Sequence, residues 1–181
     1  MKKALSIISK FTLVSVSSLI QSVIFIIALF LIFFLSYILG RSYLLGNSFA
    51  GNDTTNFFNV VYWLSQTFPK VPFWFPLQGG GISFTGYPWF SAYLVNIVDK
   101  LTVLDLVQSF RFLGFLSVPL TGLGIYIFIW TRLKEVKPIW MRQILGLIAS
   151  VFFVTAPVSW IWLLQWGFYA EQVSLIFVPW I

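Results

Sequence analysis

The sequence predicts an all-α polytopic membrane protein with three full transmembrane helices, the start of a fourth, and a large extracytoplasmic first loop that bears two short interfacial helices. Three observations lead to this fold class. Hydrophobic residues make up 59% of the 181 positions. Charged residues make up 9%, whereas a soluble domain has about 25%. Three uncharged apolar runs are each long enough to cross a bilayer.

The residue types that are missing narrow the chemistry. The chain has no cysteine and no histidine, which excludes disulfides, thiolate zinc sites and histidine-based catalytic triads. Proton transfer must therefore fall to a carboxylate. The net charge of +6 comes from basic residues beside the apolar runs, so it indicates membrane orientation and no nucleic-acid partner. The five acidic residues are Asp53, Asp99, Asp105, Glu135 and Glu171.

The spans follow from the lengths of the apolar runs. Residues 1–10 precede a first span at 11–39, which is too long for a signal peptide and indicates an uncleaved anchor. The second and third spans are expected at 111–131 and 143–164. A further apolar run at 173–181 is too short to cross a bilayer, so we expect the chain to be the N-terminal part of a larger protein.

The basic residues orient these spans. Residues 87–98 are apolar, but 12 residues suit an interfacial or re-entrant helix better than a span. If this segment stays on one side, seven basic residues lie inside and four outside, as the positive-inside rule favours. The N-terminus and residues 132–142 are then cytoplasmic, whereas the loops at 40–110 and 165–172 are external.

The first external loop has three parts. Residues 54–68 predict an amphipathic helix that lies on the outer leaflet. Residues 69–88 are rich in proline and glycine, which predicts an irregular segment lining a cavity, and 87–98 form the second short helix. The 13 aromatic residues between positions 57 and 93 form either a belt at the membrane surface or a packing surface for a sugar or an isoprenoid chain. The apolar face of the first helix is expected to contain Phe57, Val60, Val61, Leu64 and Phe68.

Two acids are placed by this topology outside the membrane and at the ends of spans. Asp53 either caps the helix that follows it or takes a proton from an acceptor hydroxyl, and the two roles are compatible. Glu171 is either a solvated turn residue or a functional carboxylate at the membrane surface. Arg111 begins the second span and either snorkels or binds a phosphate. The other acids are expected to be solvated residues, helix caps or structural: Asp99, Asp105 and Glu135.

The order of these features resembles a known superfamily. The first span is followed by Gly51-Asn52-Asp53, an external amphipathic helix and Tyr87-Pro88-Trp89-Phe90. Arg111 then opens the second span, and Ala170-Glu171 follows the third. This order is similar to the N-terminal part of a GT-C type membrane glycosyltransferase, and most similar to a prokaryotic membrane family labelled 6-pyruvoyl-tetrahydropterin synthase-related.

The resemblance implies an enzyme that moves a hexosyl or pentosyl group from a polyprenyl-phosphate donor to a glycan, lipid or protein acceptor. The reaction would take place on the outer face of the cytoplasmic membrane. By position, Asp53 would act on the acceptor and Glu171 would assist, while Arg111, Asn52 and Tyr87 would bind substrate. Neither acid has an acidic neighbour in sequence. A divalent cation, if one is needed, would be held by the same two acids.

A non-enzymatic multi-pass membrane protein is the alternative, as a lipid-linked-sugar carrier, a transporter subunit or an assembly partner. A transporter should carry ionisable groups at mid-membrane and paired broken helices. The predicted spans hold no charged residue at their centres, and their interruptions are Pro119 and Pro157. These features favour the glycosyltransferase.

Overall fold

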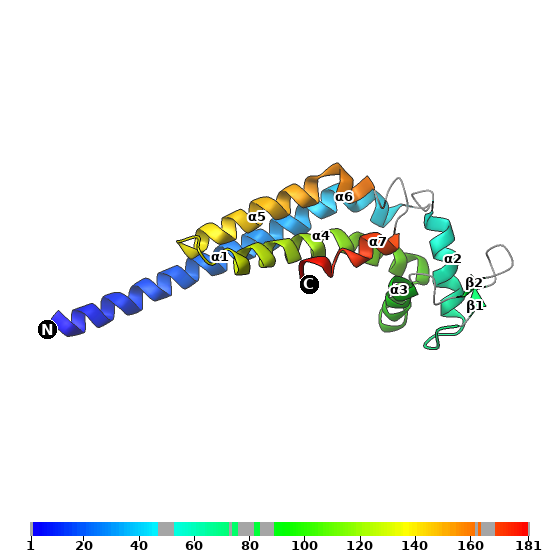
Figure 1. The fold of residues 1–181 in the computed structure, drawn as a ribbon, viewed down its shortest axis with the longest axis horizontal. Coiled ribbons are helices and arrows are strands. Elements are labelled where there is room, and N and C mark those ends of the chain that lie inside the picture. Colours follow the sequence, from blue (N-terminus) through cyan, green and yellow to red (C-terminus); the bar gives the residue numbers. More distant parts are fainter. Residues whose placement is uncertain are drawn as a thin grey trace.

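Three long helices lie side by side and form the body of the molecule. α1 (Lys2–Leu45), α4 (Leu106–Arg132) and α5 (Ile139–Thr155) pack against one another, and the N-terminal part of α1 projects beyond the other two (Figure 1). The computed structural model describes residues 2–46, 53–72, 74–75, 82–83, 89–161, 163 and 169–180.

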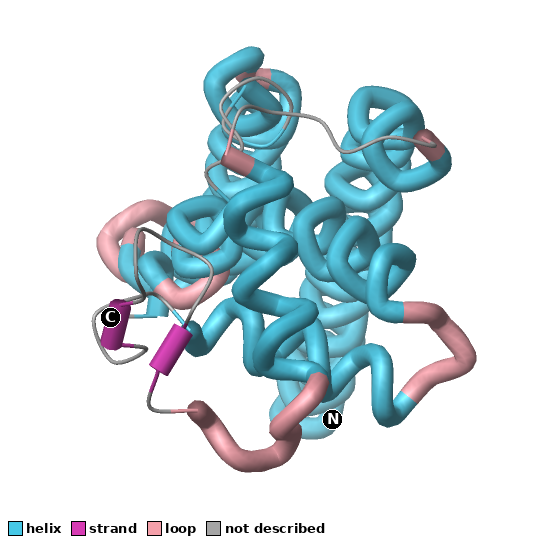
Figure 2. The backbone as a smooth tube through the Cα atoms, turned by 90° about the vertical axis from the view of Figure 1, so that its right-hand side faces the viewer, coloured by secondary structure: helices cyan, strands magenta, loops and turns pink. Residues whose placement is uncertain are grey.

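Shorter elements gather at the opposite end of the bundle, which we call the cap end. α2 and α3 pack against each other there, and α3 and α7 pack against α4. Seen from the cap end, the long helices run away from the viewer (Figure 2). The short elements at this end are α2 (Thr54–Ser65), β1 (Trp74–Phe75), β2 (Ile82–Ser83), α3 (Trp89–Leu101), α6 (Pro157–Ile161) and α7 (Tyr169–Ser174), whereas the 3₁₀ helix η3 (Val178–Trp180) lies farther back along α4.

Two helices in the described part of the chain are long and apolar enough to cross a membrane. They are Val16–Leu45 within α1 and the whole of α4. Leu19, Ile26 and Phe30 of α1 expose 64%, 63% and 63% of their surfaces. Such large exposed apolar side chains suit contact with lipid. The helical fold is confirmed, and the two apolar helices support a membrane protein.

The predicted third span is interrupted. α5 ends at Thr155, and Ala156 takes an extended conformation with φ −63° and ψ 129°. Pro157 explains the break, because a proline disfavours helical backbone at the residue before it. α6 then begins at Pro157. The 17 residues of α5 extend about 26 Å, so a third full span at 143–164 is not confirmed.

The start of a fourth span at 173–181 is also not confirmed. α7 ends at Ser174, a turn follows, and η3 contains Pro179, which has no backbone N–H to donate. η3 packs against α4, so the chain runs back alongside the bundle from the cap end (Figure 1).

The amphipathic helix of the first loop is present, but its apolar face meets protein. α2 buries four of the five residues predicted to share a face: Phe57, Val60, Val61 and Leu64. This face packs against α3 and against Phe110 of α4. The apolar face of the helix was therefore predicted correctly, but the prediction that this face lies on the outer leaflet was wrong, because it packs against α3 and α4.

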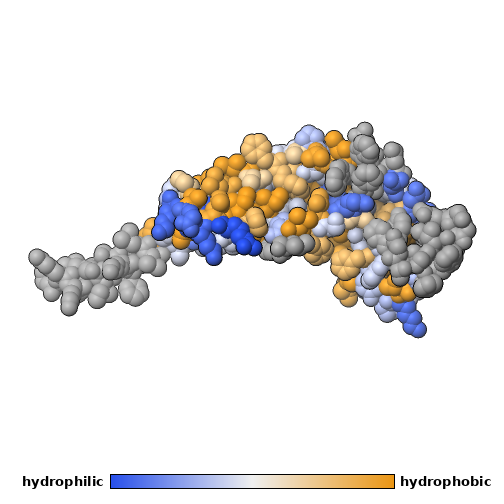
Figure 3. All heavy atoms as spheres, viewed as in Figure 1, coloured by the Kyte–Doolittle hydropathy of each residue, from blue (hydrophilic) through white to orange (hydrophobic). Residues whose placement is uncertain are grey.

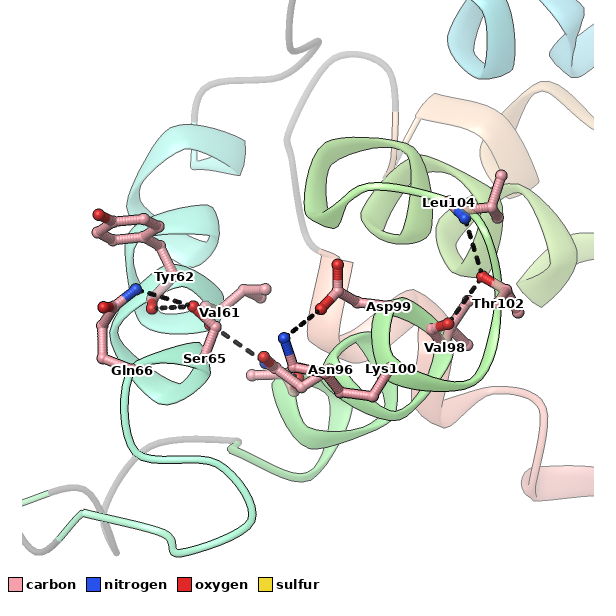
Figure 4. A network of polar contacts seen from close by, with 11 residues as sticks. Val61, Tyr62, Ser65, Gln66, Asn96, Val98, Asp99, Lys100, Thr102 and Leu104 are labelled. Carbon is pink, nitrogen blue, oxygen red and sulfur yellow. Dashed lines mark hydrogen bonds and ion pairs between the residues drawn. The ribbon is translucent and has the colours of Figure 1, made fainter.

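The second short helix is confirmed as α3. Its 13 residues extend about 20 Å, which is too short for a span. Asn96 is fully buried on α3, and its amide donates hydrogen bonds to the carbonyls of Val61 on α2, at 3.1 Å, and of Ala92, at 2.9 Å. Figure 4 shows this side chain reaching across to α2. Such a buried bond fixes how the two helices of the cap end meet.

The segment rich in proline and glycine contains a strand pair that the sequence did not predict. β1 and β2 are antiparallel, with Trp74 opposite Ser83 and Phe75 opposite Ile82. The expectation that this segment forms no regular helix agrees with its described residues. Most of 73–88 lies outside the described part, so the predicted cavity lining stays a prediction.

Two glycines let the long helices approach closely. A Cβ atom on Gly146 of α5 would lie 2.8 Å from the backbone oxygen of Tyr126 on α4. A Cβ atom on Gly122 of α4 would lie 2.8 Å from a methyl group of Val154 on α5. Helices in membranes pack through such small residues, and the two glycines let α4 and α5 approach each other closely.

Candidate functional site

Three stacked rings join α2, α4 and α7 at the cap end. The rings of Phe110 and Tyr169 are stacked with centroids 4.0 Å apart, and Phe57 stacks on Tyr169 at 5.2 Å. The Tyr169 hydroxyl donates a hydrogen bond of 2.9 Å to the backbone carbonyl of Phe110. We call Phe57, Phe110 and Tyr169 the aromatic stack. All three residues are buried, so the stack is a rigid point of reference for the groups around it.

Tyr43 of α1 reaches the same place from the long helix. Its side chain is 5% exposed, and its hydroxyl has no hydrogen-bond partner among the described residues. A Cβ atom on Gly114 would lie 2.7 Å from the Tyr43 hydroxyl oxygen and 2.8 Å from a ring carbon of Tyr169. The missing side chain of Gly114 therefore makes room for both phenols. α1, α4 and α7 meet around this glycine.

Arg111 lies beside this junction on α4. It directly follows Phe110 of the aromatic stack, and its side chain is half-buried. A guanidinium at the end of a span, where the apolar helices meet the cap end, is suited to binding an anion. Arg111 is the basic residue that the sequence proposed for a phosphate.

Asp53 occupies the N-cap position of α2, as the sequence predicted. Its backbone carbonyl accepts a hydrogen bond of 3.0 Å from the Phe57 N–H, but its carboxylate makes no capping hydrogen bond. The side chain is exposed. Asp53 therefore lies one helical turn from the aromatic stack with a carboxylate that is not committed to capping α2.

Glu171 lies on the first turn of α7, two residues after Tyr169 of the stack. It lines an open hollow of about 230 Å³ between α3 and α7. The hollow is lined by Phe90, Ser91, Ala170, Glu171, Ser174 and Phe177.

Aromatic side chains form the walls of this hollow, and the Glu171 carboxylate lies between them. The rings of Phe90 and Phe177 have centroids 6.0 Å apart and are 51% and 43% exposed. The Ser174 hydroxyl donates to the Glu171 carbonyl at 2.6 Å, so its proton is already committed to the backbone. Mostly apolar walls with few polar groups are typical of small-ligand sites. The Glu171 carboxylate is the charged group among the described lining residues.

The site residues are only partly brought together. Asp53, Arg111 and Glu171 each lie within one turn of the aromatic stack, but of the three only Glu171 lines the described hollow. In the described part of the chain, no three acidic residues gather as a metal-binding group. The prediction of a divalent cation held by Asp53 and Glu171 stays a prediction. The predicted substrate-binding residues Asn52 and Tyr87 lie outside the described residues.

The other acids have structural roles or lie apart. Asp105 caps α4 through a capping box, in which its carboxylate accepts from the Gln108 N–H at 2.7 Å and the Gln108 side chain accepts from the Asp105 N–H at 3.0 Å. Asp99 pairs with the neighbouring Lys100 at 3.0 Å, and Figure 4 shows this pair on α3. Both agree with the roles expected from sequence. Glu135 is exposed in the loop between α4 and α5.

Sequence reasoning missed Tyr43, Tyr169 and Phe177 of this region. Tyr43 and Tyr169 are 126 positions apart along the chain and meet beside Gly114, so no local pattern indicates them. Phe177 was counted only as part of the apolar run at 173–181, whereas Phe90 is one of the 13 aromatic residues for which the sequence proposed a membrane belt or a packing surface for a sugar or an isoprenoid chain. The one sequence signal that could have indicated the two tyrosines is a tyrosine inside an otherwise apolar run, because a buried phenol needs a polar neighbour.

Comparison of the chain with protein-family models, with curated proteins and with solved structures gives no match. The resemblance to GT-C enzymes therefore rests on the residues quoted above, and a function must be argued from the cap end itself.

Proposed function

We propose that this chain forms the membrane-embedded part of a GT-C type glycosyltransferase. It would transfer a sugar from a polyprenyl-phosphate donor to an acceptor hydroxyl on the outer face of the cytoplasmic membrane. The cap end would be the extracytoplasmic side, and the basic loop between α4 and α5 would be cytoplasmic, in accord with the positive-inside rule.

One observation carries this proposal. Three groups of the kinds needed for sugar transfer from a phosphate each lie within four residues of a member of one buried feature, the aromatic stack. Asp53 precedes Phe57 by one turn, Arg111 directly follows Phe110, and Glu171 lies two residues after Tyr169. They lie on or directly before α2, α4 and α7, which are distant in sequence, and the aromatic stack joins these three helices at one end of the bundle.

The proposed chemistry gives each group one task. The acceptor oxygen attacks the anomeric carbon of the sugar while the bond from that carbon to the phosphate oxygen breaks. The phosphate leaves with the bonding electron pair, and Arg111 neutralises its charge. Asp53 takes the proton of the acceptor hydroxyl, a step that contributes about 10²–10⁴-fold to the rate. Glu171 binds sugar hydroxyls in the hollow between Phe90 and Phe177.

The membrane topology follows from the same orientation. α1 and α4 would cross the bilayer, and α5 together with α6 would make the third crossing despite the break at Ala156. η3 runs along α4 away from the cap end, which is the direction a fourth crossing would take. A non-enzymatic transporter should have paired broken helices at mid-membrane. α4 continues through Pro119 as one helix, so α5–α6 has no broken counterpart there.

The test is a transfer assay with the protein expressed from its complete gene in its native membranes. Polyprenyl-phosphate sugars of several kinds are supplied with a radioactive label, and label transfer to endogenous acceptors is measured. Asp53→Asn should abolish transfer, and Glu171→Gln should weaken it mainly through KM. Asp99→Asn is the matched control, because it makes the same change in the same external loop at a residue paired with Lys100.

Two results would contradict the proposal. Full transfer activity in Asp53→Asn, at unchanged protein level in the membrane, would remove the assigned base. Absence of transfer with every donor, together with movement of lipid-linked sugar across reconstituted vesicles, would instead establish a carrier.

A further inference from the structure

The hollow between α3 and α7 offers hydrogen-bond acceptors to a ligand. An ionised carboxylate such as that of Glu171 accepts hydrogen bonds and donates none. The Ser174 hydroxyl already donates to the Glu171 carbonyl at 2.6 Å. The buried Ser91 hydroxyl donates to the Ala170 carbonyl over a longer distance of 3.5 Å. Among the described residues that line the hollow, the polar side chains therefore have free acceptor positions and no uncommitted donor.

The Glu171 side chain is accessible to such a ligand. It is exposed, and it lines the hollow. Within the described part of the chain, Glu171 forms no ion pair with a lysine or an arginine, and the ion pair that is present there joins Lys100 to Asp99 on α3. The negative charge of Glu171 is therefore not balanced by a described basic side chain.

Two aromatic rings border the same hollow. Phe90 is 51% exposed and Phe177 is 43% exposed, so much of each ring is free to contact a ligand. The face of an aromatic ring attracts a cation that lies within about 6 Å of the ring centroid. The two centroids are 6.0 Å apart, so one small cation can lie within that range of both rings. The rings and the carboxylate thus favour a ligand group of the same charge.

A primary ammonium group has the properties that this lining favours. It carries a positive charge and three N–H donors, and it has no acceptor that would need a donor from the protein. A hydroxyl group has no charge and only one donor, so it makes less use of the carboxylate and of the rings. A phosphate or carboxylate group would be repelled by Glu171.

The place of the hollow indicates what carries the ammonium group. Glu171 follows Tyr169 of the aromatic stack by two residues, so the hollow lies at the end of the bundle that holds the groups of the proposed reaction. Figure 3 shows a largely apolar surface along the bundle, with hydrophilic surface toward its two ends. A polar sugar suits the cap end, whereas a hydrocarbon chain suits the apolar sides of the bundle.

We propose that the hollow binds a protonated primary amine, and that this amine belongs to the sugar of the proposed transfer reaction, which is therefore an amino sugar. The ammonium group donates to the Glu171 carboxylate and to the Ser174 oxygen, and it lies against the rings of Phe90 and Phe177. The identity of the sugar as a substrate rests on the proposed function, whereas binding of the amine requires no transfer. The head group of an aminophospholipid carries the same ammonium group, and the experiment separates the two.

The test compares soluble methyl glycosides that share one sugar ring. Methyl glucosaminide carries the amine, its N-acetyl derivative is neutral, and methyl glucoside has a hydroxyl group in place of the amine. Each is titrated against the full-length protein in detergent at about pH 6, where the amine is protonated and the carboxylate is ionised. Binding is measured by saturation-transfer difference NMR. We expect the amino sugar to bind about tenfold more tightly than either neutral sugar.

Glycerophosphoethanolamine, the soluble head group of an aminophospholipid, is titrated in the same way. We expect it to bind more weakly than the amino sugar, because its phosphate is repelled by Glu171. Tighter binding of glycerophosphoethanolamine than of the amino sugar would overturn the assignment to a sugar.

Variants assign the effect to the hollow. Glu171→Gln keeps the size of the side chain and removes its charge, so binding of the amino sugar should fall about tenfold, to the level of the neutral sugars. Glu135→Gln is the matched control, because Glu135 is also exposed but lies in the loop between α4 and α5. Phe177→Leu should weaken amino-sugar binding about threefold, whereas Phe152→Leu, at a ring that is 72% exposed on α5, should leave it unchanged.

Two results would overturn this proposal. One is equal binding of the amino sugar and the neutral sugars to the folded protein. The other is a preference for the amino sugar that persists in Glu171→Gln and in Phe177→Leu. Neither readout needs catalysis, so a failure of the proposed function is seen separately, as absence of transfer from every donor by a protein that still prefers the amino sugar.

Discussion

The ring of Tyr169 lies 4.0 Å from that of Phe110 and within 15° of parallel to it, while its hydroxyl donates to the Phe110 carbonyl at 2.9 Å. Phe110 therefore holds α7 by two independent contacts, one apolar and one polar. Glu171 is carried on that short helix, so its position at the hollow depends on this pair. A six-residue helix is not stable alone, and packing must supply its stability.

Truncation of the Tyr169 side chain should strongly destabilise the protein. Tyr169→Ala removes both contacts to Phe110 and should lower the free energy of unfolding by about 3–5 kcal/mol, as removal of a large buried aromatic side chain does. Tyr169→Phe keeps the stacked ring and loses one hydrogen bond, at about 0.5–1.5 kcal/mol. Thermal unfolding in detergent micelles, followed by tryptophan fluorescence, measures both. Equal losses in the two variants would mean that the stacking contributes nothing.

Alkaline conditions should weaken the cap end. Burial raises the pKa of Tyr169 well above its ordinary value of 10.0, and the nearby Tyr43 phenol adds to the rise. The unfolded chain loses this proton first, so the contribution of Tyr169 to stability is complete below about pH 10 and falls as the pH rises further. The stability of Tyr169→Phe should fall less steeply than that of the wild type between pH 9 and 11, about one unit on either side of that value. Parallel curves for the two proteins would show that Tyr169 ionises normally.

The stability that is lost when a glycine is replaced by alanine should depend on which atom the new methyl group contacts. Gly146→Ala forces a Cβ atom to within 2.8 Å of the Tyr126 backbone oxygen, which cannot move without shifting α4. Gly122→Ala meets a Val154 methyl group at the same distance, and a side chain can yield. Gly146→Ala should cost more, within the range of about 1–3 kcal/mol for overpacking. The same unfolding assay decides the order, and a larger loss in Gly122→Ala would show that α4 and α5 adjust as rigid bodies.

Local patterns predicted local structure well at the cap end. The spacing of Phe57, Val60, Val61 and Leu64 gave the buried face of α2, because helical periodicity reports which side is covered. It could not report what covers that side, since either lipid or another helix can cover an apolar face. The break at Ala156 was available from Pro157 alone, through the restriction that a proline places on the preceding residue.

The candidate site was less accessible to sequence reasoning. Asp53 and Glu171 were found because acids are few and the ends of spans are informative. Their relation to each other runs through Phe57, Tyr169 and Phe110, which come from three helices. Such contacts depend on tertiary packing, and a single sequence contains no local trace of them.

The conformation of the basic loop between α4 and α5 should depend on the side chain of Arg142. The Arg142 guanidinium donates to the carbonyls of both Lys134 and Val136, which closes the loop between α4 and α5. Arg142→Lys keeps the charge but loses the planar fork that allows two such bonds at once. Trypsin should therefore cut the loop several-fold faster in this variant, whereas Arg132→Lys, a change at an exposed position, should leave the rate unchanged. In sealed inverted vesicles the same cleavage reports which side of the membrane the loop faces. Protection of the loop there would reverse the proposed orientation.

The two aspartates at helix starts should separate a structural role from a functional one. The Asp105 carboxylate accepts the Gln108 N–H at 2.7 Å, and Asp105→Ala should lower stability by about 1 kcal/mol. Asp53 occupies the same position on α2 without a capping bond, so Asp53→Ala should change stability by less than about 0.5 kcal/mol. Unfolding and sugar transfer are measured on the same preparations. We expect Asp105→Ala to lose stability and keep transfer, and Asp53→Ala to keep stability and lose transfer. A stability loss in Asp53→Ala as large as that in Asp105→Ala would make Asp53 a cap, and any loss of transfer would then reflect a displaced α2.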